Sequence, residues 1–308
     1  MERERRHLRD GQHPGGPGAR FEDRNAAGTR EYQGAGWVPR YTQIAASRFV
    51  NEGSFEKTGA GETVIEARLD NLGRMTAIDA ALLILAGRTS NTGTLEAVRS
   101  RVVVWGPLEQ LQQGQLPGRR YIARDGTLVF NLGPEGPVPH SITENHADIV
   151  LEGRHARLAT VWRGTDQNAL RSLELNDGTI TLLDGARLSM GGPLRQSGAL
   201  HIGAGSTLSA AALWQCPEQE EDRPAVWLAR VLDAPDIRIF AGRFSAGAED
   251  EVGRAAIRGQ LLLSGRTVLD MRASIASMSW TSTVPWQWAG NCGWRSKAIS
   301  PCWAPSGS

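Results

Sequence analysis

The sequence predicts an all-β fold, a parallel β-helix with coils of about 20 residues. Three observations predict it. A motif of Asn, any residue and Gly returns every 20 residues, short β-branched segments lie between its copies, and turn-forming residues bound those segments. We expect the coils over residues 46–272, between non-repetitive tails at residues 1–45 and 273–308.

Five stretches of the chain carry the repeat, and they begin at Asn51, Asn71, Asn91, Asn176 and Gln196. Their third position is glycine: Gly53, Gly73, Gly93, Gly178 and Gly198. Their fifth position is large and apolar: Phe55, Met75, Leu95, Ile180 and Leu200. Their tenth position is small: Ala60, Ala80, Ser100, Gly185 and Gly205. Further along the coil, three pairs of residues are aligned: Val64 and Ile65, Ile84 and Leu85, Val104 and Trp105.

Each position has a physical interpretation. Glycine at the third position supplies a positive φ at a corner where a Cβ would clash. Asparagine at the first position either stacks its side-chain amide on the next coil, forming a ladder, or reflects ordinary turn preference. The apolar fifth position points inward, so Met75 and Leu95 are expected to touch in neighbouring coils. A leucine-rich repeat does not fit, because no copy has the L-x-x-L-x-L-x-x-N core.

Strands are expected where β-branched residues cluster between turn residues, as in "ETVIEA", "RVVVWG", "GTLVFNL" and "GTITLL". Residues 114–172 lose the strict period, although "GRRYIARDGTLVFNLG" and "ADIVLEG" still predict strands. The stretch Asp166–Glu174 fits either a helical turn or a coil with a bulged corner. Residues 216–224 are polar and predict a loop. Short apolar strands resume at Val226.

The run "GSFEKTGAGETVIEARLDNLG" resembles repeats of large bacterial surface proteins of the autotransporter-passenger and filamentous-haemagglutinin-like type. Runs such as "ITENHADIVLEG", "LHIGAGSTLSA" and "SGRTVLDM" resemble the same array, so the resemblance spans residues 49–271. It implies a right-handed β-helix at the cell surface or outside the cell, as part of a larger solenoid. The partners it implies are surface glycans or proteins of a host or neighbouring cell. Such arrays carry adhesion, spacing and enzymatic roles alike.

Both ends of the chain depart from this pattern. The resemblance implies an export signal and a C-terminal anchor, but residues 1–20 lack the apolar stretch of a signal peptide. No apolar run reaches the roughly 20 residues that span a bilayer. Five of the ten tryptophans fall in residues 280–308. One hypothesis explains both ends: they are translated out of frame, and the chain is a gene fragment.

Carboxylates are the first candidates for chemistry. A β-helix glycosidase needs two of them roughly 5–10 Å apart across a groove. The candidates are Glu144 with Asp148, Asp233 with Asp236, and the run of Glu249, Asp250 and Glu251. Solvated carboxylates in turns are the simpler interpretation of all three groups. The acidic run also lacks the spaced ligand pattern of a calcium loop.

Three other groups complete the candidates: His140, His146 and His155; Arg119, Arg120 and Arg124; and Cys216, Cys292 and Cys302. The histidines lack the i, i+4 spacing of a helical zinc site. The arginines lack aromatic interleaving, and the net charge of +1 provides no global attraction for nucleic acid. The cysteines form neither a CxxC pair nor a disulfide framework. We therefore assign no catalytic, cofactor-binding or metal-binding residue.

Two functions from different classes follow. The sequence favours a non-catalytic structural or adhesive β-helix segment of an exported bacterial surface protein. The alternative is a glycan-processing β-helix enzyme, a polysaccharide lyase or glycosidase, whose groove residues come from residues 114–172. A carboxylate pair that lines a groove across stacked coils would favour the enzyme.

Overall fold

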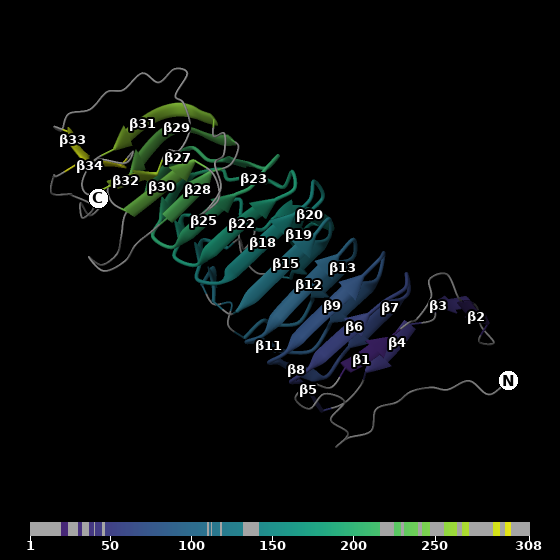
Figure 1. The fold of residues 1–308 in the computed structure, drawn as a ribbon. Helices are drawn as coiled ribbons and strands as arrows, with labels where there is room; N and C mark the ends of the chain where they lie inside the picture. Colours follow the sequence, from purple (N-terminus) through teal and green to yellow (C-terminus); the bar gives the residue numbers. More distant parts are fainter. Residues whose placement is uncertain are drawn as a thin grey trace. The chain divides into compact units, whose positions relative to one another are not determined.

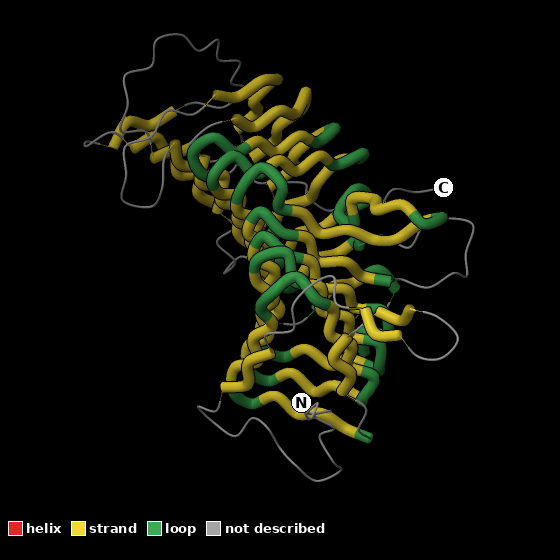
Figure 2. Tube along the Cα trace, turned by 90° about the vertical axis from the view of Figure 1, so that its right-hand side faces the viewer, coloured by secondary structure: helices red, strands yellow, loops and turns green. Residues whose placement is uncertain are grey.

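The protein folds as a β-solenoid (Figure 1). The computed structural model describes residues 20–23, 30–32, 37–39, 41–44, 47–109, 111, 113–117, 119–131, 142–215, 225–228, 231–239, 242–246, 256–263, 267–270, 286–289 and 293–296. These residues form strands and turns, with no helix among them (Figure 2). Parallel strands stack in about 7 turns of about 24 residues. The predicted all-β parallel solenoid is confirmed, with turns that are on average longer than the 20-residue repeat.

The chain divides into two compact units. Unit 1 comprises residues 1–141 and 150–169, and unit 2 comprises residues 142–149 and 170–308. Strand β18 (Asp148–Glu152) contains the boundary between their residues. The units therefore interleave along the chain.

Unit 1 has three parallel sheets. Its first sheet contains β1 (Arg20–Asp23), β6 (Ser54–Lys57), β9 (Arg74–Ile78), β12 (Thr94–Val98) and β15 (Arg120–Arg124). Its second sheet contains β4 (Tyr41–Ile44), β7 (Glu62–Ile65), β10 (Leu82–Leu85), β13 (Arg101–Val104), β16 (Thr127–Phe130), β19 (Arg157–Trp162) and the antiparallel β20 (Thr165–Asn168). The third contains β5 (Arg48–Asn51), β8 (Arg68–Asn71) and β11 (Thr89–Asn91). Two further pieces are the antiparallel pair β2 (Arg30–Tyr32) and β3 (Trp37–Pro39), and β14 (Gln115–Leu116).

Unit 2 has two main sheets. One contains β22 (Thr179–Leu183), β25 (Ala199–Ile202), β28 (Ala225–Leu228), β30 (Gly242–Ala246), β32 (Thr267–Asp270) and an antiparallel end formed by β34 (Gly293–Ser296) and β33 (Trp286–Ala289). The other contains β17 (Glu144–Asn145), β21 (Leu175–Asn176), β24 (Pro193–Gln196), β27 (Ala212–Gln215) and β29 (Val231–Ile239). Strands β23 (Arg187–Ser189), β26 (Thr207–Ser209) and β31 (Ala256–Leu263) extend it around β29.

The apolar residues of the repeat form the core, as predicted. Leu95 is level with Met75 in the neighbouring strand, and both side chains are fully buried. All five residues at the fifth position are at most 1% exposed, since alternate residues of a strand point to one side of the sheet. Beyond Leu95 the same column continues with Tyr121. The ring centroids of Tyr121 and Phe130 lie 5.6 Å apart, in an edge-to-face arrangement.

One predicted alignment was wrong by one residue. Ile84 and Leu85 are level with Val64 and Ile65, as predicted, but the next strand brings Val103 and Val104 beside them. The coil is one residue shorter here than the strict repeat. Trp105 consequently follows the strand, where its side chain is 52% exposed.

The asparagines form the predicted amide ladders. In unit 1, the Asn51 amide donates to Asn71 and the Asn71 amide donates to Asn91, each at 2.7 Å. In unit 2, Asn145 donates to Asn176 at 2.7 Å, and Asn176 donates to Gln196 at 2.8 Å. All of these side chains are buried. The ladder interpretation therefore holds over ordinary turn preference, because each amide bonds to the amide of the next coil.

The third-position glycines have a different role from the predicted one. Among the described residues, positive φ values occur at other glycines, so the positive-φ interpretation of Gly73, Gly93, Gly178 and Gly198 is wrong. These glycines are needed because the coils approach closely. A Cβ on Gly73 would lie 2.0 Å from the carbonyl oxygen of Gly53, and the same contact recurs between Gly93 and Gly73.

The left-handed corner lies later in the coil. Asp79 and Ala80 have φ values of 54° and 60°, and Arg99 and Asp125 have values of 46° and 45°. Backbone bonds link these corners from coil to coil, from Ala80 N to Arg99 O at 2.8 Å and from Arg99 N to Arg124 O at 2.8 Å. The small tenth position of the repeat lies at this corner, and its members Ala80, Gly185 and Gly205 have positive φ values.

The irregular region forms a hairpin and turns. Strands β19 and β20 are joined by Arg163 and Gly164, whose φ values of 49° and 76° fit a two-residue type I′ turn. Residues 165–168 form strand β20 and residues 169–172 are turns, so no helix forms over Asp166–Glu174. The predicted loop at 216–224 lies outside the described residues, as does most of both predicted tails. Within those tails, β1 pairs with β6 and β4 pairs with β7.

Candidate functional site

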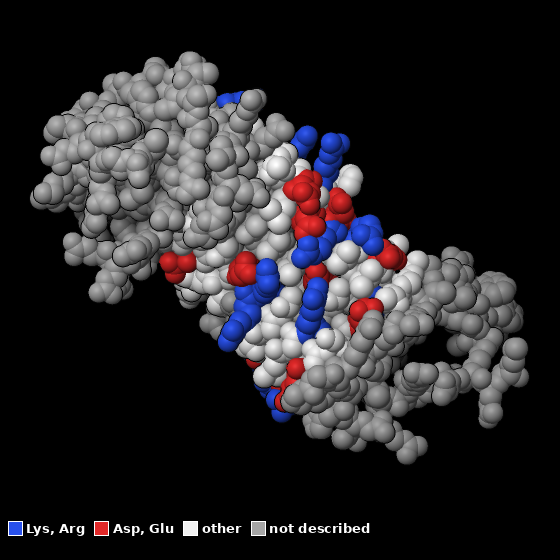
Figure 3. Space-filling model, in the orientation of Figure 1, with Lys and Arg blue, Asp and Glu red and all other residues white. Residues whose placement is uncertain are grey.

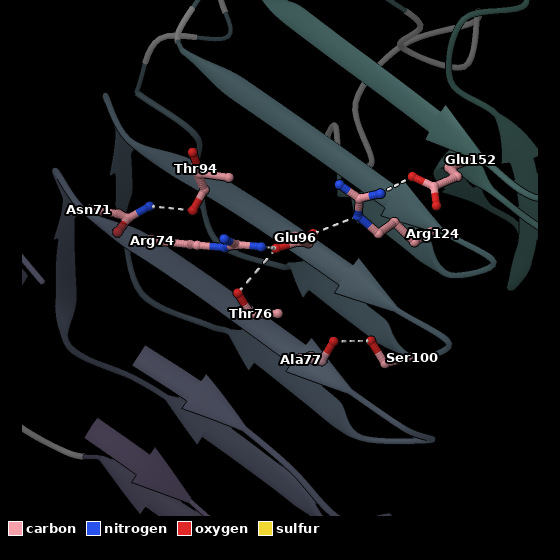
Figure 4. A network of polar contacts seen from close by, with 9 residues as sticks. All are labelled: Asn71, Arg74, Thr76, Ala77, Thr94, Glu96, Ser100, Arg124 and Glu152. Atoms are coloured by element: carbon pink, nitrogen blue, oxygen red, sulfur yellow. Dashed lines mark hydrogen bonds and ion pairs between the residues drawn. The ribbon is translucent and has the colours of Figure 1, made fainter. Parts of the chain in front are cut away.

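A ladder of alternating charges runs across the outer side of the first sheet of unit 1 (Figure 4). Glu96 accepts a hydrogen bond from Arg74 Nε at 2.8 Å and another from Arg124 Nε at 3.0 Å. Arg124 also donates a hydrogen bond from Nη1 to the Glu152 carboxylate. The ladder therefore joins β9, β12, β15 and β18, one charge from each strand. We call these four residues the charge ladder.

The centre of the charge ladder is its most buried part. The Glu96 side chain is 1% exposed, whereas the side chains of Arg74 and Arg124 are 55% and 39% exposed. Thr76, the residue level with Glu96, adds a hydrogen bond at 3.4 Å. Two guanidinium groups thus compensate a carboxylate that would be costly to bury alone. Figure 3 shows basic and acidic side chains side by side on this face of the described residues.

A second ladder follows the third sheet of unit 1. Asp70 contacts Arg48 at 2.5 Å and Arg68 at 3.6 Å. Glu109 contacts Arg68 at 3.5 Å and Arg88 at 2.9 Å. Each carboxylate therefore links arginines that stand one coil apart. These arginines are more than half exposed, so solvent screens the pairs and each contributes little to stability.

One ion pair of unit 1 joins residues that are 65 positions apart. Arg101 on β13 donates two hydrogen bonds to Asp166 on β20, at 2.5 and 2.8 Å. The hydrogen bond from Arg101 holds the pKa of the Asp166 carboxyl below its ordinary value, although partial burial opposes this. The same bond raises the pKa of Arg101. Such two-pronged contacts are the strongest arrangement of these two groups.

Unit 2 brings one sequence candidate, Glu144, to a histidine. His146 Nε2 lies 3.4 Å from the Glu144 carboxylate, and His146 Nδ1 lies 3.0 Å from Asp177. Ser197 donates to the other oxygen of Asp177 at 3.1 Å. His146, Asp177 and Ser197 each follow a rung of the amide ladder, so the ladder sets their spacing. The carboxylate lies between serine and histidine, which is not the order that activates a serine nucleophile.

The other carboxylates lie in separate places. Asp148 begins β18 and is half-buried. Asp233 and Asp236 flank an irregularity in β29, and Asp236 pairs with Arg238 at 2.9 Å. Glu249, Asp250 and Glu251 lie outside the described residues.

The remaining candidates also separate. The His155 backbone N–H donates to Asp125 at 3.1 Å, and Arg124 belongs to the charge ladder. Arg119 precedes β15 and Arg120 begins it, both exposed. His140, Cys216, Cys292 and Cys302 lie outside the described residues.

Comparisons with protein-family models, curated proteins and solved structures found no match to this chain. Within the described part of the chain, no three His, Cys, Asp or Glu side chains are grouped so as to hold a metal ion. Nor does this part contain a helix long and apolar enough to cross a membrane.

Sequence reasoning missed the charge ladder. Its partners lie 22 and 28 residues apart, a coil length plus an offset across the strand. The strict 20-residue alignment brings Thr76, and not Arg74, level with Glu96. A search for opposite charges at one coil length plus or minus two residues would have found the first contact. The second depends on the length of the following coil, which the repeat does not predict.

Proposed function

We propose that the chain is a non-catalytic structural or adhesive β-solenoid segment of an exported bacterial surface protein. The β-solenoid itself is established by the parallel register of the strands. The charge ladder is the observation that carries the proposal. Its side chains bond to one another across successive coils, so they reinforce a continuous outer surface. A stack reinforced both inside and outside is suited to a stiff spacer or a repetitive binding face.

Export to the cell surface and a glycan or protein partner are parts of this proposal. They come from the resemblance of the repeats to surface-protein arrays. The near-neutral net charge of +1 favours a partner held by shape and hydrogen bonding over one drawn by long-range attraction.

A glycan-processing enzyme is the second candidate, and one observation favours it. Glu144 and Asp177 contact the two nitrogens of His146, and all three side chains are between 34% and 40% exposed. Acid–base chemistry on a glycan uses a pair of carboxylates of this kind. The enzyme candidate therefore has a specific site, at Glu144, His146 and Asp177.

One experiment separates the two candidates. The chain is incubated with neutral and acidic polysaccharides, while retention on the immobilised polysaccharide and release of new chain ends are measured together. A structural or adhesive segment yields no new chain ends. Its retention, if any, is unchanged in Glu144→Gln.

Release of chain ends that falls at least about 100-fold in Glu144→Gln would establish the enzyme and overturn the proposal. Asp236→Asn is the matched control, because that carboxylate is also partly exposed but pairs with Arg238.

A further inference from the structure

The sequence contains four aspartates that are followed directly by glycine. Three of these steps lie among the described residues: Asp125–Gly126, Asp177–Gly178 and Asp184–Gly185. An Asp–Gly step can rearrange, because glycine has no Cβ that shields its amide nitrogen from the preceding carboxyl group. The reaction needs a carboxyl group that can turn toward that nitrogen and an N–H that is not bonded elsewhere. The three steps differ in both respects.

The step Asp177–Gly178 is held at both groups. The Asp177 carboxylate lies 3.0 Å from His146 Nδ1 and accepts a hydrogen bond from Ser197 at 3.1 Å. The Gly178 N–H donates to Asn145 O of the neighbouring coil at 2.8 Å. The carboxyl group and the nitrogen therefore cannot meet unless contacts at both groups are broken first.

The step Asp125–Gly126 is held at its carboxyl group. Asp125 Oδ1 accepts a hydrogen bond from the His155 backbone N–H at 3.1 Å. The same oxygen lies against the backbone of Gly153, where a Cβ would be only 2.3 Å from it. Gly126 itself is buried. The turn at residues 153–155 therefore fixes this carboxylate in place.

The step Asp184–Gly185 is held at neither group. Its two residues form the centre of the turn that follows β22, with φ values of 52° and 86°, and Ala186 N donates to Leu183 O at 3.0 Å across it. Asp184 is exposed. No described residue forms a hydrogen bond or ion pair with its carboxylate, and none accepts from the Gly185 N–H. The adjoining coil brings Gly205 beside this nitrogen, and that residue has no side chain with which to cover it.

We propose that Asp184 is a modification site, at which isoaspartate forms without an enzyme. The Gly185 nitrogen attacks Cγ of Asp184, and the carboxyl OH leaves with the N–H proton as water, so that a five-membered succinimide forms. One water molecule then adds to either ring carbonyl. Opening at the side-chain carbonyl restores aspartate. Opening at the main-chain carbonyl leaves the chain linked through Cγ, which adds one carbon atom to the backbone between β22 and β23.

The test compares the three steps within one folded protein. The purified chain is kept folded in neutral buffer for several weeks, and digested samples are analysed by mass spectrometry with electron-transfer fragmentation, which distinguishes isoaspartate from aspartate. We expect isoaspartate to accumulate at Asp184 at least about tenfold faster than at Asp177, because hydrogen bonds at Asp177 must break before reaction. Asp184 should also react faster than Asp125.

The unfolded chain in urea is the matched control. All three steps have the same Asp–Gly sequence, so their rates should agree within about threefold once the contacts of the folded state are lost. A second control is Gly185→Asn, since asparagine tolerates a positive φ but adds a Cβ beside the nitrogen. This variant should form isoaspartate at Asp184 at least about fivefold more slowly, with Asp125 and Asp177 unchanged.

Three results would overturn the proposal. The first is a rate at Asp184 that is no higher than at Asp177 or Asp125 in the folded chain. The second is a difference that persists in urea, because flanking residues and not the fold would then set the rates. The third is unchanged accumulation in folded Gly185→Asn, with folding verified by circular dichroism. If that variant does not fold, the comparison between the folded and unfolded unaltered chain decides.

Discussion

The two amide ladders have the same contacts but different spacing in the sequence. In unit 1 the rungs Asn51, Asn71 and Asn91 are 20 residues apart. In unit 2 the first two rungs, Asn145 and Asn176, are 31 residues apart, yet their hydrogen bond has the same length of 2.7 Å. The fold therefore requires that the amides be level at the corner, and it accommodates extra residues elsewhere in the coil. Coil length is variable, whereas the register at the ladder is kept.

The two ladders end in a similar way. In unit 1 the Asn91 side chain hydrogen-bonds with Tyr121, but the Asn91 Nδ2 atom is buried without a hydrogen-bond partner of its own among the described residues. In unit 2 Gln196 accepts from Asn176, but its own Nε2 is buried without a hydrogen-bond partner among the described residues. A rung in the middle of a ladder should therefore contribute more than a rung at its end.

The largest effect should come from the third-position glycines, which occur beside the amide ladder in both units. A Cβ at Gly73 or at Gly198 would lie 2.0 Å from the carbonyl oxygen of Gly53 or Gly178. Backbone would have to move, so we expect Gly73→Ala and Gly198→Ala each to lower the free energy of unfolding by about 4 kcal/mol or more. Thermal unfolding measures this. Gly192→Ala is the control, because no atom lies within 4 Å of its Cβ position. Equal losses at Gly192 and Gly73 would contradict the close-approach explanation.

The next largest effect should distinguish a middle rung from an end rung. Asn71→Leu keeps the volume but removes three hydrogen bonds inside the protein, one from the Asn51 amide, one to Asn91 and one to Thr94 O, at a cost of about 2–4 kcal/mol. Gln196→Leu should cost about 1 kcal/mol, since the Asn176 amide still donates to Ala199 O at 3.1 Å. Urea titration of both variants tests the difference. A larger loss for Gln196→Leu would reverse the comparison.

The sequence predicts the strict coils because each one repeats both its rung and its glycine at a fixed interval. Asn145 escaped this search, because the 31-residue interval to Asn176 breaks the period while its contact is unchanged. The one-residue shift at Val103 escaped for the same reason. At the candidate site, the contact between His146 and Asp177 can be predicted only once the preceding asparagines are known to be level in neighbouring coils. The contact between Arg101 and Asp166 joins residues 65 positions apart on β13 and β20, and no repeat spacing predicts it.

The tyrosine at the end of the ladder in unit 1 should make stability depend on alkaline pH. Burial raises the pKa of Tyr121 to about 12, against about 10 in the unfolded chain. The stabilisation is complete below pH 10 and is lost as the pH rises toward 12, because the unfolded chain ionises first. Tyr121→Phe should remove about 2 kcal/mol of this alkaline loss. Urea titrations between pH 8 and 12 measure it, and parallel pH profiles of the two proteins would contradict the assignment.

The smallest effect should be at the exposed corner. Asp79 pairs with Arg99, but the two side chains are 61% and 62% exposed. Asp79→Asn should therefore change the free energy of unfolding by less than about 0.5 kcal/mol. A loss comparable to that of Asn71→Leu would mean that exposed pairs and buried rungs contribute alike.

The most direct test of the account is a double-mutant cycle between neighbouring rungs. The central claim is that buried amides on successive coils bond to each other and so hold the solenoid in register. Free energies of unfolding are measured for Asn71→Leu, Asn91→Leu and the double variant, with Asn71→Leu and Asn131→Leu as the reference cycle. We predict a coupling of at least about 1 kcal/mol between Asn71 and Asn91, and none beyond about 0.3 kcal/mol between Asn71 and Asn131. Strictly additive losses at Asn71 and Asn91 would contradict the claim.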